Sequence, residues 1–140
     1  EANQAAHSVI KTEPLNSAAW QILGLTALEK QKYQEAIGYF TKAIYAQPKA
    51  ICYFNLGIAH KKLNLIDLAI EHYKTCLKLE PSMVKAWANL ANCYRSQNHI
   101  HEAIECYEKA IDLEPDNALS HFNLGLLYHS EKKFDEAIKA

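Results

Sequence analysis

The sequence predicts an all-α fold, an α-solenoid built from antiparallel pairs of short helices. Four prolines recur at intervals of 34, 33 and 34 residues, at Pro14, Pro48, Pro81 and Pro115. Within each interval, apolar residues follow the period of a helix over two separate stretches. A period near 34 residues that contains two helical stretches predicts a stacked array of helix pairs.

The prolines divide the chain into repeating units. Because a pair of helices this short cannot bury its apolar face alone, each pair is expected to stack on the next one. We expect a single domain over residues 1–140 that is a segment of a longer array. The predicted parts are the second helix of a preceding unit at 1–16, full units at 17–49, 50–83 and 84–117, and a partial unit at 118–140.

The first helix of each unit is predicted from four residues with spacings of 3, 1 and 3, which lie on one face of a helix. This face is expected to pack into the stack. The four residues are Trp20, Leu23, Gly24 and Ala27, then Tyr53, Leu56, Gly57 and His60, then Trp87, Leu90, Ala91 and Tyr94, and finally His121, Leu124, Gly125 and Tyr128.

The second helix of each unit is predicted from small residues that flank an aromatic residue, which allows close approach to its neighbours. Asparagine in the preceding turn suits the left-handed conformation that such a turn requires. The small and aromatic residues are Ala36, Phe40 and Ala43, then Ala69, Tyr73 and Cys76, then Ala103, Tyr107 and Ala110, with Ala137 in the last unit. The turns are expected at Gln31, Asn64, Asn98 and Lys132, and the helices are expected to begin at Tyr33, Ile66, Ile100 and Phe134.

Each proline follows a helix that it cannot continue and precedes the start of a new one. Side chains that suit an N-cap follow three of the four prolines. They are Asn16 or Ser17, Ser82, and Asp116 or Asn117. The junction after Pro48 has only Lys49 and Ala50, so that helix start is expected to be the least well capped.

The charge and composition exclude several classes of partner. The net charge is -1 and no block of like charge occurs, so neither nucleic acid nor an anionic membrane surface is expected to bind. No apolar run approaches the roughly 20 residues that span a bilayer, so membrane insertion is not expected. Cys52, Cys76, Cys93 and Cys106 form no C-x-x-C pair, and we interpret them as reduced thiols. Reduced cysteines favour a cytoplasmic or a nuclear location.

We expect no enzymatic activity, no cofactor and no metal. The chain has no glycine-rich phosphate loop, nucleophile elbow or H-E-x-x-H motif. Its histidines offer no constellation for acid–base chemistry, because His60, His72 and His121 occupy predicted packing positions. His99 and His101 are predicted to lie in a turn.

The segments WQILGLTA and EAIGYF, followed by QP, resemble the tetratricopeptide repeat. The resemblance covers essentially all 140 residues. It implies a right-handed superhelix with a concave groove, which is lined by the side of each first helix that faces away from the packing residues. The implied function is a non-catalytic protein–protein interaction scaffold that binds an extended partner segment in this groove.

Two features of the predicted groove indicate peptide binding. Asn55, Asn89 and Asn123 occupy the same place in consecutive units, and an amide can both donate to and accept from a peptide backbone. Several other groove residues are apolar where packing does not require it, which indicates a pocket. The candidate peptide contacts are Gln21, Leu25, Phe54, Asn55, Ile58, Lys85, Asn89, Asn92, Phe122, Asn123 and Leu126.

Each feature has an alternative interpretation. The asparagines could satisfy neighbouring groups of their own chain, since most side-chain hydrogen bonds are local. The apolar residues could be half-buried against the adjacent unit. Lys61, Lys62, Lys85 and Arg95 are interpreted as solvated charges, although Lys85 and Arg95 could meet an acidic partner.

The resemblance also allows narrower functions to be compared. Family members that clamp the carboxyl terminus of heat-shock chaperones use two lysines, two asparagines and an arginine at fixed positions. Here those positions hold Gln21, Leu25, Asn55, Lys85 and Asn89, or one unit later Phe54, Ile58, Asn89, Leu119 and Asn123, so chaperone-tail binding is disfavoured.

Two further hypotheses remain open. The asparagine series is similar to that of O-linked N-acetylglucosamine transferases, which suggests a substrate-recruiting arm of a larger enzyme, although the series fails at Ile22. End-to-end self-association is also expected, because both ends of the repeat pattern leave an apolar surface without its partner.

Overall fold

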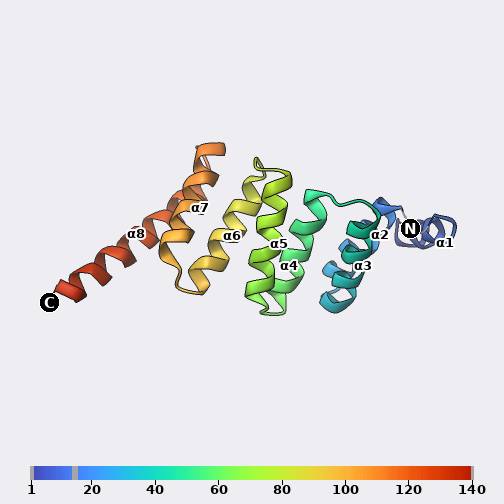
Figure 1. The fold of residues 1–140 in the computed structure, drawn as a ribbon, viewed down its shortest axis with the longest axis horizontal. Helices are drawn as coiled ribbons and strands as arrows, with labels where there is room; N and C mark the ends of the chain where they lie inside the picture. Colours follow the sequence, from blue (N-terminus) through green and yellow to red (C-terminus); the bar gives the residue numbers. More distant parts are fainter. Residues whose placement is uncertain (1, 14–15, 140) are drawn as a thin grey trace. The chain divides into compact units, whose positions relative to one another are not determined.

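The structure, a computed structural model, describes residues 2–13 and 16–139, with side chains as far as residue 132. Over this part of the chain the fold is all-α, as predicted, with eight helices and no strand (Figure 1). The helices are α1 (Ala2–Thr12), α2 (Ser17–Glu29), α3 (Tyr33–Ala46), α4 (Ala50–Lys62), α5 (Ile66–Leu79), α6 (Val84–Ser96), α7 (Ile100–Leu113) and α8 (Ala118–Lys139).

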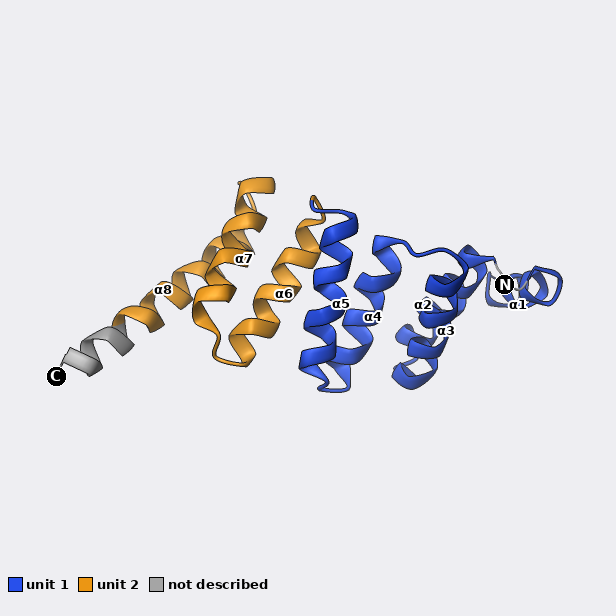
Figure 2. Cartoon of the chain, viewed as in Figure 1, with its two compact units in different colours: residues 1–81 blue, residues 82–140 orange. Residues whose placement is uncertain are grey.

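The chain forms two compact units (Figure 2). Unit 1 (Glu1–Pro81) contains α1 to α5, and unit 2 (Ser82–Ala140) contains α6 to α8. In unit 1, α2 packs on α3 and α4 packs on α5, while α1 packs on α2. In unit 2, α6 packs on α7 and α7 packs on α8. The single domain over residues 1–140 and its repeat boundaries stay predictions.

Three of the four predicted turns have the expected backbone. Gln31, Asn64 and Asn98 adopt φ angles of 61°, 61° and 62°, in the left-handed region. The helices that follow begin at the predicted residues Tyr33, Ile66 and Ile100. Glutamine at the first turn therefore adopts the same conformation as asparagine at the other two, because the helix pairing requires it.

The predicted turn at Lys132 is wrong, because α8 runs through this residue from Ala118 to Lys139. The stretch around Lys132 contains several strong helix formers and neither glycine nor asparagine, so a continuous helix satisfies its backbone hydrogen bonds without a left-handed residue. Pro14 and the side chains of Phe134 and Ala137 lie outside the described residues.

The helix starts follow the capping prediction in three of four cases. Asn16 caps α2 and Asn117 caps α8, each accepting a backbone N–H, at 3.0 Å and 2.9 Å respectively. Lys49 precedes α4 and makes no side-chain capping bond, as expected. Ser82 was predicted to cap the third unit, but Met83 occupies the N-cap of α6, so that prediction is wrong.

Aromatic rings of the second helices lie against glycines of the first helices. A Cβ atom placed on Gly24 would lie 2.6 Å from the ring of Phe40, and one placed on Gly57 would lie 2.5 Å from the ring of Tyr73. Both rings are buried. The glycines are therefore required because they let the two helices of a pair approach closely.

The packing face predicted for α8 is also wrong. His121, Gly125 and Tyr128 are exposed, and Leu124 is only half-buried. Among the side chains of this helix that the structure describes, Ser120, Asn123 and Leu127 are buried instead. The predicted face is open because α8 continues as one helix to Lys139, so no second helix within the described residues covers it.

Candidate interaction surface

The candidate surface in unit 1 lies on α2 and α4, and it is partly apolar. Leu25 is 44% exposed, and Ile22 and Ile51 are also exposed. Ile58 is half-buried. Two of the predicted contacts, Leu25 and Ile58, therefore present apolar surface that the core of unit 1 does not fully cover.

Gln21 is held in place by a short chain of hydrogen bonds. Its Nε2 donates to Ser17 Oγ at 3.2 Å, and Ser17 Oγ donates to the Ala43 carbonyl oxygen at 3.1 Å. Ser17 is buried, so these bonds satisfy a polar group inside the α2–α3 pair. Gln21 is half-buried and has a fixed orientation at the edge of the surface.

Phe54 and Asn55 differ from the prediction. Phe54 is only 9% exposed, and its ring centroid lies 5.9 Å from that of Tyr73 in α5. The prediction that packing does not require an apolar residue here is wrong, because this ring is part of the α4–α5 contact. Asn55 is 5% exposed and presents little of its amide to a partner.

In unit 2, the predicted contacts on α6 have different environments. Lys85 is exposed, and Asn89 is half-buried. Asn92 accepts a hydrogen bond from the hydroxyl of buried Tyr107 in α7. Burial raises the pKa of Tyr107, and the nearby Arg95 charge partly offsets this effect, so the phenol remains a donor at neutral pH.

The predicted contacts on α8 include one buried amide and two exposed apolar residues. Arg95 Nη1 donates to Asn123 Oδ1 at 3.2 Å, and Asn123 is only 8% exposed. The alternative interpretation, in which an asparagine serves its own chain, therefore holds for Asn123. Phe122 is 64% exposed, and Leu126 is also exposed.

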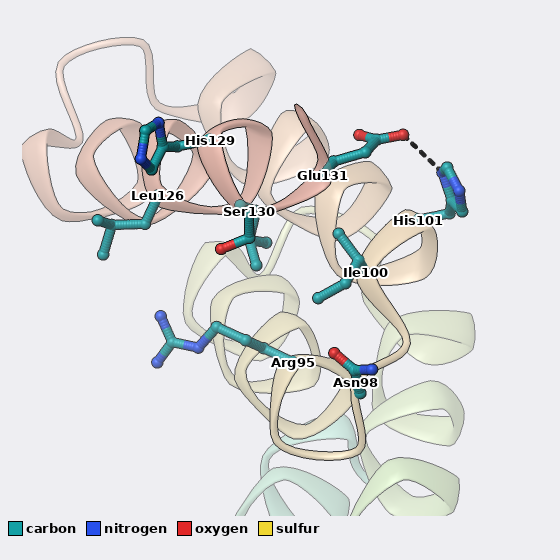
Figure 3. A pocket seen from close by; sticks show the side chains of 9 residues that line it. Arg95, Asn98, Ile100, His101, Leu126, His129, Ser130 and Glu131 are labelled. Carbon is teal, nitrogen blue, oxygen red and sulfur yellow. Dashed lines mark ion pairs between the residues drawn. The ribbon is translucent and has the colours of Figure 1, made fainter. Parts of the chain in front are cut away.

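A cavity of about 700 Å³ lies in unit 2 between α6, α7 and α8 (Figure 3). Ile100, Leu126 and Leu127 give it an apolar lining. Arg95 and Ser130 also line it, and the close-up shows Arg95 on the α6 side with Leu126 on the α8 side. Leu126 is the predicted contact that lines this cavity.

The rim of the cavity carries charge. On the side formed by α7 and α8, His101 Nδ1 lies 3.5 Å from Glu131 Oε1 (Figure 3). From the sequence, Arg95 is interpreted as a solvated charge that could meet an acidic partner, and it is not among the predicted contacts. Ser130 and the α7 residues are not among them either, although Arg95 and Ser130 lie on the groove side of their helices. The prediction that His101 lies in a turn is wrong, because Ile100 and His101 are the first two residues of α7. The packing of α8 brings both residues to the cavity.

Two of the histidines in unit 1, His60 and His72, lie in the packing between helices, whereas His7 is exposed. His60 is buried, its Nδ1 lies 2.9 Å from the Leu56 carbonyl oxygen, and its ring centroid lies 4.8 Å from that of His72. Burial, and then the proximity of His60, lower the pKa of His72. Both residues occupy packing positions, as predicted.

The described residues contain no group of three His, Cys, Asp or Glu side chains that could hold a metal ion. Within the described part of the chain, no helix is long and apolar enough to cross a membrane.

Family models of the tetratricopeptide repeat match residues 1–51 and 50–83, and a model described as TPR repeat matches residues 91–132. The chain belongs to the tetratricopeptide repeat family. The predicted fold class is confirmed by this match and by solved structures of the same repeat type. Repeats of this kind are in general non-catalytic interaction modules.

One curated relative is protein O-mannosyl-transferase TMTC1 from Mus musculus, which is 26% identical over 95 residues. The match covers 64% of this chain but only 10% of that protein. The chain is also similar to the crystal structure of MamA, with a TM-score of 0.87 and 28% identity, over 98% of this chain and 81% of that one.

The fold is also similar to the first tetratricopeptide domain of Spaghetti (RPAP3), which was solved bound to the HSP90 peptide SRMEEVD. The TM-score is 0.80 and the identity is 23%, over 83% of this chain and 93% of that one.

Proposed function

We propose that this chain is a protein-interaction module that holds an extended segment of a partner against the exposed sides of its first helices. One observation carries the proposal. Of the large hydrophobic residues exposed in the described part of the chain, half lie at groove positions of first helices, namely Ile22, Leu25, Ile51, Leu119, Phe122 and Leu126. Exposed apolar side chains that recur at one kind of repeat position favour a binding role.

The HSP90 peptide bound to the Spaghetti (RPAP3) domain supports binding of a peptide segment by this fold. Within this chain, Gln21, Leu25, Ile58, Lys85, Asn89, Phe122 and Leu126 keep enough exposure to contact a partner. Phe54, Asn55 and Asn123 act mainly inside their own units. The amide series is therefore a weaker basis for binding than the apolar residues are.

Photo-crosslinking tests this proposal. A benzophenone side chain is placed at Leu25 or at Phe122, and crosslinked products are collected from an extract of the source cells. The controls place the same group at Leu68 on α5 and at Leu113 on α7, which are 41% and 44% exposed but do not lie on first helices. We expect one discrete product from Leu25 and Phe122 and none from the controls. Equal labelling from all four positions contradicts the proposal.

A second candidate is a substrate-recruiting arm of a larger glycosyltransferase, which the match to an O-mannosyl-transferase favours. The same crosslinking experiment separates the two candidates. Many unrelated products, none of them stoichiometric, support the recruiting arm. One product in a stoichiometric complex supports the interaction module.

A further inference from the structure

The cavity of unit 2 combines an apolar interior with a single cation. Ile100, Leu126 and Leu127 provide the apolar lining. The cavity is open to solvent, since Leu126 and Ser130 are exposed, and its volume of about 700 Å³ exceeds what one methyl or isopropyl group fills. The cavity can therefore accept a large apolar side chain together with part of the backbone that carries it.

Arg95 lies at the surface and donates a hydrogen bond to a neutral group. Its Nη1 donates to the neutral amide oxygen of Asn123 at 3.2 Å, which leaves other guanidinium N–H groups available. Within residues 2–13 and 16–132, no carboxylate forms an ion pair with Arg95. Arg95 is exposed, so a partner can reach its guanidinium, whose planar arrangement of N–H groups can donate to both oxygens of a carboxylate.

The opposite rim of the cavity disfavours a bound carboxylate. Glu131 lies there beside His101, at 3.5 Å. A second carboxylate near Glu131 is repelled, whereas one near Arg95 is attracted. The charges therefore favour one direction for a bound acidic segment.

The spacing of a suitable ligand follows from the geometry of an extended chain. Side chains at positions i and i+2 of such a chain point to the same side, whereas neighbours point to opposite sides. Leu126 and Arg95 face the same cavity from α8 and α6 (Figure 3). We therefore assign the apolar side chain in the cavity and the carboxylate at Arg95 to residues two positions apart, the shortest spacing that places both on the same side of an extended chain.

On the basis of the proposed function, we propose that this cavity binds an extended partner segment with a large apolar residue at one position and Asp or Glu two positions away. The apolar side chain enters between Ile100 and Leu126, and the carboxylate accepts two hydrogen bonds from Arg95. The carboxylate belongs to an internal side chain. Arg95 is the one Lys or Arg among the described residues that line the cavity, so it balances one carboxylate and not a terminal cluster of them.

The test uses synthetic peptides of twelve residues with blocked ends, in a Ser/Gly/Ala background. One peptide contains Leu-Ala-Asp, and its matched controls contain Leu-Ala-Asn, Leu-Asp-Ala or Ser-Ala-Asp. A fifth peptide ends in Leu-Ala-Asn with a free carboxylate. Each is titrated into ¹⁵N-labelled protein, and affinity is obtained from the amide shifts.

We expect the Leu-Ala-Asp peptide to bind about tenfold or more tightly than each control, because a charge-assisted bidentate pair and the apolar contact are both present. The largest shifts should fall on the amides of Ile100, Leu126 and Ser130. In the Arg95→Gln variant, the Asp and Asn peptides should bind equally well. In the Leu126→Ser variant, both should bind more weakly.

Lys109→Gln serves as the matched charge control, because Lys109 is an exposed residue of α7 that does not line the cavity. This variant should keep the preference for the Asp peptide. Thermal unfolding of each variant confirms that the fold is retained. Arg95→Lys keeps the charge but lacks the planar guanidinium, so it should retain only part of the preference for the Asp peptide.

Several outcomes overturn the inference. They are equal binding of the Asp and Asn peptides, a preference that survives Arg95→Gln, tighter binding of the peptide with the free terminal carboxylate, or no shift with any peptide. None of these results overturns the proposed function, which fails only if crosslinking does not favour Leu25 and Phe122 over the second-helix controls.

Discussion

The Leu-Gly pair of the first helix has opposite surroundings in α2 and in α8. At Gly24 of α2, the ring of Phe40 lies where a Cβ atom would be, and the distance would be only 2.6 Å. At Gly125 of α8, no atom of the described residues lies within 4 Å of the same position. The same sequence element therefore produces a tight helix contact only where a second helix folds back over it.

This difference extends to the side chains around each glycine. Leu23, next to Gly24, is buried, whereas Leu124, next to Gly125, is half-buried and Tyr128 is exposed. The stabilising contribution of a repeat thus comes from the pairing of its helices more than from the first helix alone. Substitutions that affect α2 and α8 differently measure this contribution.

The largest difference is expected between two phenylalanines. Phe40→Ala removes a fully buried ring and should lower the free energy of unfolding by about 3–5 kcal/mol. Phe122→Ala removes a ring that is mostly exposed and should change it by less than about 0.5 kcal/mol. Urea unfolding checks both variants. A similar loss of unfolding free energy in the two variants would mean that the Phe122 ring is packed against the protein in solution.

The glycines provide the next largest effect. Gly24→Ala and Gly57→Ala should each destabilise by about 1–2 kcal/mol, because overpacking against a buried ring exceeds the gain in helix propensity. Gly125→Ala should stabilise by up to about 1 kcal/mol, because alanine favours the helix and meets no neighbour. The comparison fails if Gly125→Ala lowers the melting temperature.

A smaller effect is expected at Tyr128, whose hydroxyl donates to Glu108 Oε1 at 2.7 Å and links α8 to α7. Tyr128→Phe should cost about 0.5 kcal/mol, since the bond is exposed to solvent. Glu108→Gln is the matched variant, because it keeps an acceptor and should cost less. An unchanged melting temperature in the Tyr128→Phe variant would show that this hydrogen bond does not stabilise the packing of α8 on α7.

The smallest effect concerns pH. The pKa of His72 is lowered from 6.5 by burial and by the neighbouring His60, while Glu71 acts in the opposite direction. The unfolded chain therefore takes up a proton at a higher pH than the folded chain does, and stability is lost as the pH falls below 6.5.

We expect the melting temperature to drop between pH 7.5 and pH 5.5, and to drop less in the His72→Gln variant. His7→Gln, at an exposed position of α1, is the control and should follow the parent chain. A His72→Gln variant with an unchanged pH dependence would show that another group causes it.

The helices and their turns could be predicted from the sequence because the information is local. The starts at Tyr33, Ile66 and Ile100, and the left-handed residues before them, follow from periodicity and from turn chemistry. The turn at Lys132 could not be predicted correctly in the same way. At Lys132 the local sequence favours a helix. In the other repeats, the turn is followed by a second helix that packs against the first one.

The candidate site was predicted less well because it depends on contacts between helices. Burial of Phe54 depends on Tyr73 in the following helix, and the bond between Asn123 and Arg95 joins residues of different repeats. The exposed positions Leu25 and Phe122 could be predicted, because helix phase alone places them away from the core. The cavity needs the packing of α6, α7 and α8 together, which no single helix pattern contains.

The central claim is that a partner lies on the exposed sides of the first helices. It is tested most directly by methyl spectra of leucine-labelled protein, recorded with and without the partner captured by crosslinking. We expect the methyl signals of Leu25, Leu119 and Leu126 to shift, and those of Leu68, Leu79 and Leu113 on the second helices to remain unchanged. Shifts confined to the second-helix leucines would contradict the claim.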